Sequence, residues 1–176
     1  GACSKTASWA WPLSTWIPEL CRRTGEWLRC CHASLVHDIG KISIPGEILS
    51  KPGRLSSAEF ALIRVHPEAG YDIVRSIDFP WPVNDIVLQH HERLDGSGYP
   101  QGLEGDQISY GAMIVAVADV VEAMSSHRPY RPALGGDAAL DEIRKNRGRL
   151  YDPGVVDACE SIILEQGIDA LVSSTP

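Results

Sequence analysis

A single aspartate interrupts a long apolar stretch of this chain. Residues 111–124 read GAMIVAVADVVEAM, and apolar residues flank Asp119 on both sides. An unpaired charge buried in such a helix costs several kcal/mol, so we expect Asp119 to be buried beside a cation, a metal ion or a set of hydrogen-bond donors. No Lys or Arg lies one helical turn away on either side. The position therefore favours a metal ion, and an ordinary buried ion pair is the alternative.

The first half of the chain has the pattern of a helical protein. Apolar residues within 27–39 recur near the helical period, which predicts a helix that reaches His37 and Asp38 and ends at Gly40. A loop over residues 45–53 should follow it. Ser56 and Glu59 form a capping box at the start of the next helix. That helix should break near residue 66, because the proline that follows disfavours helical geometry in the residue before it.

The second half continues in the same way. Pro67 should begin a helix to Ile77, Pro82 a helix that ends near Glu92, and residues 95–98 should form a turn. Ser109 should cap the apolar helix, which extends to about residue 125. Two more helices should start at residues 137 and 152 and reach residues 147 and 166. Because no long alternating run requires a sheet, we predict an all-α domain of at least six helices.

Length and charge limit the possible classes of protein. The 176 residues suit one domain, predicted over 19–166, with an atypical N-terminal segment over 1–18 and a C-terminal tail over 167–176. The net charge of -7 argues against a DNA or RNA duplex or an anionic membrane as partner. No apolar run approaches the roughly 20 residues that span a bilayer. The five cysteines have no regular spacing, which fits a reducing compartment, and we expect a cytoplasmic protein.

Four histidines and a second aspartate complete a candidate ligand set with Asp119. They lie at predicted helix ends, from which side chains can converge in a shared cleft. Imidazole and carboxylate ligands suit Fe, Mn, Co, Ni or Zn; the carboxylates favour Fe or Mn, and the histidines argue against an all-oxygen Mg site. Six donors exceed the needs of one tetrahedral ion, so two ions bridged by a carboxylate are predicted. The candidate ligands are His37, Asp38, His66, His90, His91 and Asp119.

These residues lie in recognisable motifs. Residues 37–41, HDIGK, resemble the HD signature, and residues 90–100, HHERLDGSGYP, resemble the extended signature of the HD-GYP family. The segments HPEAG at 66–70 and RPYR at 128–131 also match, so that the resemblance covers about residues 26–165. Members of this family are helical, bind two or three metal ions and hydrolyse the bacterial second messenger cyclic di-GMP.

The resemblance implies a role for each matching residue. The six candidate ligands correspond to the family's metal ligands, with Asp38 as the bridging carboxylate, and Lys41 corresponds to a lysine that contacts the scissile phosphate. Glu92 and Asp95 should orient ligands rather than bind metal. The implied function is a metal-dependent phosphodiesterase that converts cyclic di-GMP to a linear dinucleotide or GMP. The residues implied in binding the nucleotide are Gly98, Tyr99, Pro100, Arg128 and Arg131.

The chain departs from the family pattern near its start. Family members usually carry a further histidine, often with a glutamate one turn before it, on an earlier helix, and residues 1–6 contain neither. Water, Glu19, Glu26 or another chain would have to complete that metal position. One ion should therefore bind well and a second weakly or not at all. The residues expected to hold the first ion are Asp38, His66, His90 and His91.

Two alternative functions follow from this departure. The domain could be a weak or inactive member that binds a nucleotide or a signalling protein. It could also be a hydrolase of another nucleotide or phosphoester.

Overall fold

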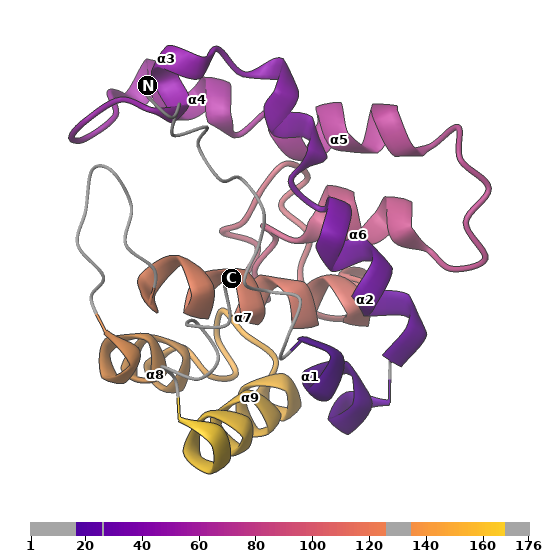
Figure 1. Ribbon diagram of the computed structural model, residues 1–176, viewed down its shortest axis with the longest axis vertical. Coiled ribbons are helices and arrows are strands. Elements are labelled where there is room, and N and C mark those ends of the chain that lie inside the picture. The colour runs from indigo at the N-terminus through magenta and orange to yellow at the C-terminus, as the bar shows by residue number, and fades with distance from the viewer. Residues whose placement is uncertain (1–16, 26, 126–134, 168–176) are drawn as a thin grey trace, which may run out of the picture.

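The computed structural model describes residues 17–25, 27–125 and 135–167, in which helices joined by turns and loops form the fold (Figure 1). The described residues form no β-strand and only two isolated bridges, Asp95–Glu104 and Arg147–Tyr151. The prediction of an all-α fold with at least six helices is confirmed. The α-helices are α1 (Ile17–Thr24), α2 (Trp27–Val36), α3 (Gly46–Leu49), α4 (Ser57–Ile63), α5 (His66–Val74), α6 (Val83–Gln89), α7 (Tyr110–Ser125), α8 (Gly136–Lys145) and α9 (Pro153–Gln166), with short 3-10 helices η2 (Ile39–Ser43) and η3 (Gly105–Gln107).

Two helix starts have the caps that the sequence predicts. At α4 the Ser56 hydroxyl accepts from the Glu59 backbone N–H at 3.3 Å, and the Glu59 carboxylate accepts from the Ser56 N–H at 2.7 Å. At α9 the Asp152 carboxylate accepts from the Val155 N–H at 3.0 Å. The predicted cap of α7 is wrong, because the Ser109 hydroxyl has no hydrogen-bond partner among the described residues.

The chain around Gly40 differs from the predicted helix end. Helix α2 already ends at Val36, and the backbone continues through Gly40 as the 3-10 helix η2. A Cβ atom on Gly40 would lie 1.9 Å from the carbonyl oxygen of His66 and 2.4 Å from the backbone nitrogen of Gly70. This glycine therefore lets η2 touch the backbone of α5, and it does not terminate a helix.

Two other boundaries differ from the prediction. The short helix α3 occupies the segment predicted as a loop. Helix α6 ends at Gln89, with His90 in the C-cap position, so that the two histidines follow the helix instead of belonging to it.

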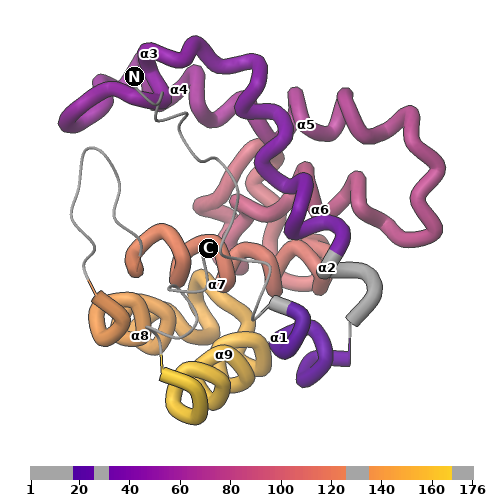
Figure 2. Tube along the Cα trace, in the orientation of Figure 1, coloured from indigo at the N-terminus to yellow at the C-terminus, as the bar shows by residue number. Residues whose placement is uncertain are grey.

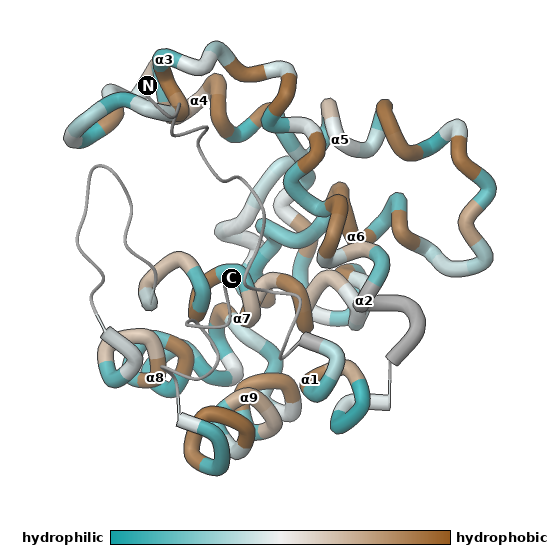
Figure 3. The backbone as a smooth tube through the Cα atoms, viewed as in Figure 1, coloured by the Kyte–Doolittle hydropathy of each residue, from teal (hydrophilic) through white to brown (hydrophobic). Residues whose placement is uncertain are grey.

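Helix α7 lies between two hydrophobic clusters. Figure 2 shows α3 and α4 at one end of the molecule, α8 and α9 at the other, and α7 between them. Ile114 and Val117 of α7 belong to a cluster with buried residues of α1, α8 and α9. Val115, on another side of the same helix, belongs to a cluster with residues of α2, α5 and α6. Hydrophobic and hydrophilic positions follow one another around α9, as expected for a helix with one face in the core (Figure 3).

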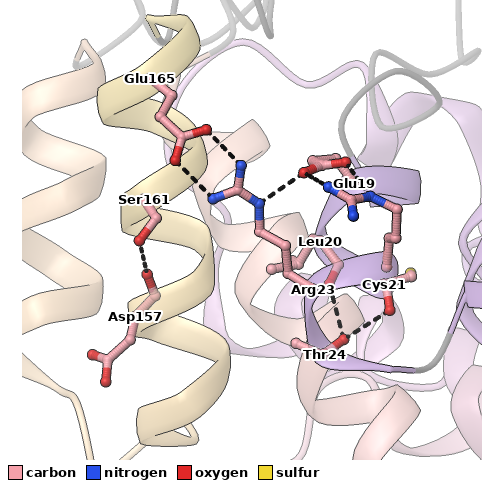
Figure 4. Close-up of polar contacts among 9 residues, drawn as sticks. Glu19, Leu20, Cys21, Arg23, Thr24, Asp157, Ser161 and Glu165 are labelled. Carbon is pink, nitrogen blue, oxygen red and sulfur yellow. Dashed lines mark hydrogen bonds and ion pairs between the residues drawn. The ribbon is translucent and has the colours of Figure 1, made fainter.

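Helix α1 is held against α9 by an arginine (Figure 4). The Arg23 guanidinium donates to Glu165 at 2.5 and 3.0 Å and to Glu19 at 2.8 Å. Hydrogen bonds from Arg22 and Arg23 lower the pKa of Glu19 to about 2. Because its carboxylate is engaged by two arginines, Glu19 is not a candidate for the additional metal ligand, and Glu26 lies outside the described residues. No helix in the described ranges has the length and apolarity needed to cross a membrane.

Candidate metal centre

Four side chains from three places in the fold converge on one point. Asp38 lies between α2 and η2, His66 begins α5, and His90 and His91 follow α6. One donor atom of each lies within 4.8 Å of the others, among the residues that the structure describes. These are the four residues that the sequence assigns to the better-bound ion. Their convergence gives three imidazoles and one carboxylate as candidate ligands.

Helix ends orient the histidines of this site. The last carbonyls of a helix have no partner within the helix, and a side chain that follows can donate to them. A carbonyl oxygen only accepts, so Nδ1 of each of these histidines donates, and Nε2 of each ring lies toward Asp38. The Nδ1 bonds are His37 to Ser34 at 2.8 Å, His66 to Ile63 at 2.7 Å and His90 to Val87 at 2.7 Å.

The Nε2 atoms of two histidines and the Asp38 carboxylate are close enough to share one cation. The Nε2 atoms of His66 and His90 are 3.2 Å apart, and Oδ1 of Asp38 lies 3.3 Å from the first and 4.0 Å from the second. A positive charge shared among these donors offsets the repulsion between them. A divalent metal ion accepts all of these donors at once, and three imidazoles with a carboxylate suit Fe, Mn, Co, Ni or Zn. The residues present thus fit a transition-metal ion.

The electrostatics keep three of the four donors in their metal-binding protonation states. Burial lowers the pKa of His90, and His37 lowers it further, so that the imidazole is neutral at pH 7. Burial and then His90 lower the pKa of His91 in the same way. Burial would raise the pKa of Asp38, but His66, His37 and Lys41 outweigh it and hold that pKa well below its usual value. His90 and His91 are therefore neutral and Asp38 is ionised, the forms that bind metals.

The other two candidate ligands lie beside this cluster and are not part of it. Nε2 of His37 is 3.6 Å from Oδ2 of Asp38, and its ring meets that of His90 edge-on at 4.9 Å between ring centroids. Asp119 lines the same cavity as His66 and His91. Asp119, which we expected to be buried, is partly buried, because α7 presents it to the cavity and not to either hydrophobic cluster.

A cavity of about 710 Å³ adjoins the converging donors. This volume lies in the range of sites for small ligands and cofactors. Lys41, one of its lining residues, donates from Nζ to the Asp38 carboxylate. The lining residues are Lys41, Ile48, Leu49, Lys51, Gly53, Arg54, Leu55, Phe60, Ile63, His66, His91, Tyr99, Asp119 and Ala123.

Gly98, Tyr99 and Pro100 are the predicted nucleotide-binding residues that the structure describes, and Tyr99 is the one of them that lines this cavity. Its ring stacks on His91 at 4.7 Å between centroids, and the Arg64 guanidinium lies 4.6 Å from the centroid of the Tyr99 ring. Burial and the nearby Asp119 carboxylate raise the pKa of Tyr99, so that its phenol keeps its proton. Gly98 and Pro100 are not among the lining residues. Arg128 and Arg131 lie outside the described residues.

Glu92 has a role that the sequence did not reveal. The side chain is buried, and its carboxylate accepts backbone N–H bonds from Gln101 at 2.7 Å, Gly102 at 3.2 Å and Leu103 at 3.1 Å. A Cβ atom on Gly98 would lie 2.4 Å from the Cα atom of Glu92, so the loop also packs directly on this residue. Glu92 therefore shapes the segment that carries Tyr99, and it does not orient the histidines.

Replacing Glu92 by glutamine should destabilise the domain. An amide offers one carbonyl oxygen where the carboxylate offers two, so at least one of these partly buried N–H groups loses its partner, at a cost of about 1 kcal/mol. Urea denaturation measures the change in the free energy of unfolding. Glu68→Gln is a matched control, because Glu68 is exposed on α5. Equal loss of stability in both variants would contradict the role given to Glu92.

Comparisons with known proteins agree with this geometry. The sequence profile of the HD domain matches residues 5–155 of the chain. The chain is 48% identical over 128 residues to the cyclic di-GMP phosphodiesterase response regulator RpfG of Xanthomonas campestris pv. campestris (strain 8004), with 72% of this chain and 34% of that protein covered. It is 39% identical over 127 residues to the 3'3'-cGAMP-specific phosphodiesterase 3 of Vibrio cholerae serotype O1, with 72% of this chain and 27% of that protein covered.

A solved structure has the same fold. Bd1817, an HDG"Y"P protein from Bdellovibrio bacteriovorus, aligns with a TM-score of 0.70 at 20% identity and covers 87% of this chain and 50% of that chain. At this identity the likeness concerns the fold alone. The chain spans about a third of the length of the first of these curated relatives and about a quarter of the second. The profile match extends over most of the sequence and includes all four residues of the cluster. The chain therefore belongs to the HD-domain family and, within it, to the HD-GYP proteins.

Proposed function

We propose that this domain is a metal-dependent phosphodiesterase that hydrolyses cyclic di-GMP. The observation that carries the proposal is the convergence of Asp38, His66, His90 and His91 beside a cavity large enough for a nucleotide ligand. The relative from Xanthomonas campestris is named as a cyclic di-GMP phosphodiesterase, which supports this substrate. Because the chain spans only part of that protein, the activity is a proposal about the domain described here.

The residues of the cavity have complementary tasks in such a reaction. The four converging side chains would hold one divalent ion, of which Fe or Mn is favoured, and His37 and Asp119 lie where they could assist a second. A bound ion supplies Lewis-acid stabilisation to the phosphoryl oxygens. Lys41 contributes a further positive charge at the same wall of the cavity, fixed in place by its bond to Asp38. The phenol of Tyr99 keeps its proton and can donate a hydrogen bond to the ligand.

Two observations favour alternative functions. The relative from Vibrio cholerae is named for 3'3'-cGAMP, which differs from cyclic di-GMP in one base, so that this dinucleotide is the second candidate substrate. The donors of His37 and Asp119 lie outside the converging group, which favours a single well-held ion. A domain that holds one ion lacks the second ion that would help to stabilise the attacking and leaving oxygens. This is the basis of the alternative in which the protein binds a nucleotide without rapid turnover.

Removal of the metal tests the proposal. Treatment with a chelator should abolish hydrolysis of cyclic di-GMP, and Mn(II) or anaerobic Fe(II) should restore it more effectively than Mg(II), because imidazole ligands suit the former ions. Liquid chromatography of the products, with metal content measured in parallel, provides the readout. Full activity after complete removal of the metal would contradict the proposal. Tight nucleotide binding without turnover in any metal would support the binding alternative.

A further inference from the structure

The cavity has a wall that the metal chemistry does not use. This wall comes from α3, the following loop and α4, and its lining residues are Ile48, Leu49, Lys51, Gly53, Arg54, Leu55, Phe60 and Ile63. Relatives of this domain are named for dinucleotides that differ in a base and share the same phosphodiester bonds. Both dinucleotides contain guanine, so a domain that acts on either of them needs side chains that recognise this base, and a phosphate-binding centre cannot supply that recognition.

We propose that Arg54 and Phe60 form a nucleobase subsite, in which Arg54 binds the acceptor edge of a guanine and Phe60 stacks on its face. The inference rests on the proposed binding of a cyclic dinucleotide and names the residues that recognise its base.

Arg54 is the cavity cation that remains available to a ligand. Among the described residues, Lys41, Lys51 and Arg54 are the cations that line the cavity. Lys41 is bonded to Asp38, and Lys51 donates to both carboxylate oxygens of Glu59, at 2.7 and 2.8 Å. Arg54 is exposed and forms no ion pair with any described residue. Its guanidinium can therefore bind a ligand without breaking an existing contact.

The loop that carries Arg54 is braced from within. Lys51 at the start of the loop is tied to Glu59 in the first turn of α4, and the same carboxylate accepts from the Ser56 N–H. These hydrogen bonds lower the pKa of Glu59 to about 2, and the bond from Lys51 has the largest effect. The loop between Lys51 and Ser56 is thus closed at both ends by one carboxylate. Such bracing reduces the ordering cost when a ligand binds to the loop.

Phe60 supplies an aromatic face in the same cavity. The residue is 48% exposed although its side chain is fully apolar, and neither hydrophobic cluster includes it. Aromatic side chains that line nucleotide sites stack on bases, whereas the edges of the bases meet polar groups. Ile63 and Leu55 extend the apolar surface beside it. The wall therefore combines an aromatic face with one guanidinium, which is the chemistry that a guanine requires.

The guanidinium favours guanine over adenine for a chemical reason. Guanine presents O6 and N7, two acceptors that match the paired N–H donors of arginine. Adenine presents its amino group in place of O6, so one arginine donor would face another donor. Arg54 should therefore distinguish the two bases, and a contact to phosphate would not.

Calorimetric binding of cyclic di-GMP and cyclic di-AMP to the chelator-treated protein tests the inference apart from catalysis. The unmodified protein should prefer cyclic di-GMP. Arg54→Gln should weaken binding of cyclic di-GMP by about 10-fold or more, leave cyclic di-AMP nearly unchanged and so remove the preference. Phe60→Leu should weaken both ligands, and Phe60→Tyr should restore them. Arg75→Gln, at an exposed arginine outside the cavity lining, is the matched control and should change neither.

Each outcome separates the subsite from the proposed activity. Equal weakening of both ligands by Arg54→Gln would indicate a phosphate contact and would overturn base recognition, as would no weakening at all. Failure of the unmodified protein to bind either dinucleotide would overturn the subsite. Selective binding without hydrolysis would support the subsite and contradict the proposed activity. Metal-dependent cleavage of bis(p-nitrophenyl) phosphate, a diester without bases, should be the same in Arg54→Gln as in the unmodified protein. A loss there would also overturn base recognition.

Discussion

Replacement of Asp38 by asparagine should lower the turnover of cyclic di-GMP by roughly 1,000-fold or more and remove most of the bound metal. Asp38 is the one carboxylate among the four converging donors, and its oxygens lie within 4 Å of His37, His66 and His90. An amide in its place has no charge to offset that of a divalent ion and no longer holds the ammonium group of Lys41. The substitution keeps the shape of the side chain, so the loss should appear in metal content and turnover and not in folding.

Metal content by mass spectrometry and initial rates of hydrolysis, both on folded protein, measure this effect. Asp72→Asn is a suitable control because Asp72 is exposed on α5. Among the described residues, its only ion pair is with Arg75, at 3.3 Å. The control should keep its metal and its activity. If Asp38→Asn retained both, the assignment of the metal site to this cluster would be wrong.

Replacement of Gly40 by alanine should destabilise the domain by about 3 kcal/mol and weaken its binding of metal. The new methyl group would overlap the carbonyl oxygen of His66 at 1.9 Å, and both partners are backbone atoms that cannot move aside alone. Relief of the clash requires η2 and α5 to separate. Because α5 begins with His66 and the segment before η2 carries Asp38, this separation would also pull two ligands apart.

Gly46→Ala is the matched control for this prediction. Gly46 lies in the short helix α3, and a Cβ atom there would meet nothing within 4 Å. Alanine should be neutral or slightly stabilising at that position, because it reduces the freedom of the unfolded chain. Urea denaturation of both variants, with metal content measured in parallel, gives the comparison. Similar stabilities for the two variants would contradict the close contact between η2 and α5.

Much of the fold could be predicted from the sequence, because the patterns that mark helix starts and helix faces involve residues only a few positions apart. The capping box of Ser56 and Glu59 and the cap at Asp152 each depend on residues within one helical turn, and the structure has both. The apolar run before Asp119 predicts a long helix, which is α7. Motifs of adjacent residues located the candidate donors for the same reason. Four of them converge, and the assignment of all six to metal stays a prediction.

Features that depend on distant contacts could not be predicted. Gly40 has the local pattern of a helix end, and only the position of α5 shows why a side chain is excluded there. The carboxylate of Glu92 is satisfied by amides that lie nine to eleven residues later, with no spacing rule that connects them. Asp119 faces a cavity that exists only when α4 and α7 are both in place. Helix α3 is four residues long, too short for a hydrophobic period.

Helix α7 contributes to both hydrophobic clusters, and this sharing determines how the domain opens. Neither hydrophobic cluster can come apart without removing α7 from the other cluster as well. The parts of the domain that contain the two clusters should therefore unfold together in one cooperative transition. Helices α3 and α4 contain no buried residues and can detach at a much smaller free-energy cost. The side of the cavity that carries the candidate metal ligands thus belongs to the part of the domain with the highest free energy of opening. The opposite wall can open by local unfolding, which gives a large ligand a way in and out without disturbing the donors that hold the metal.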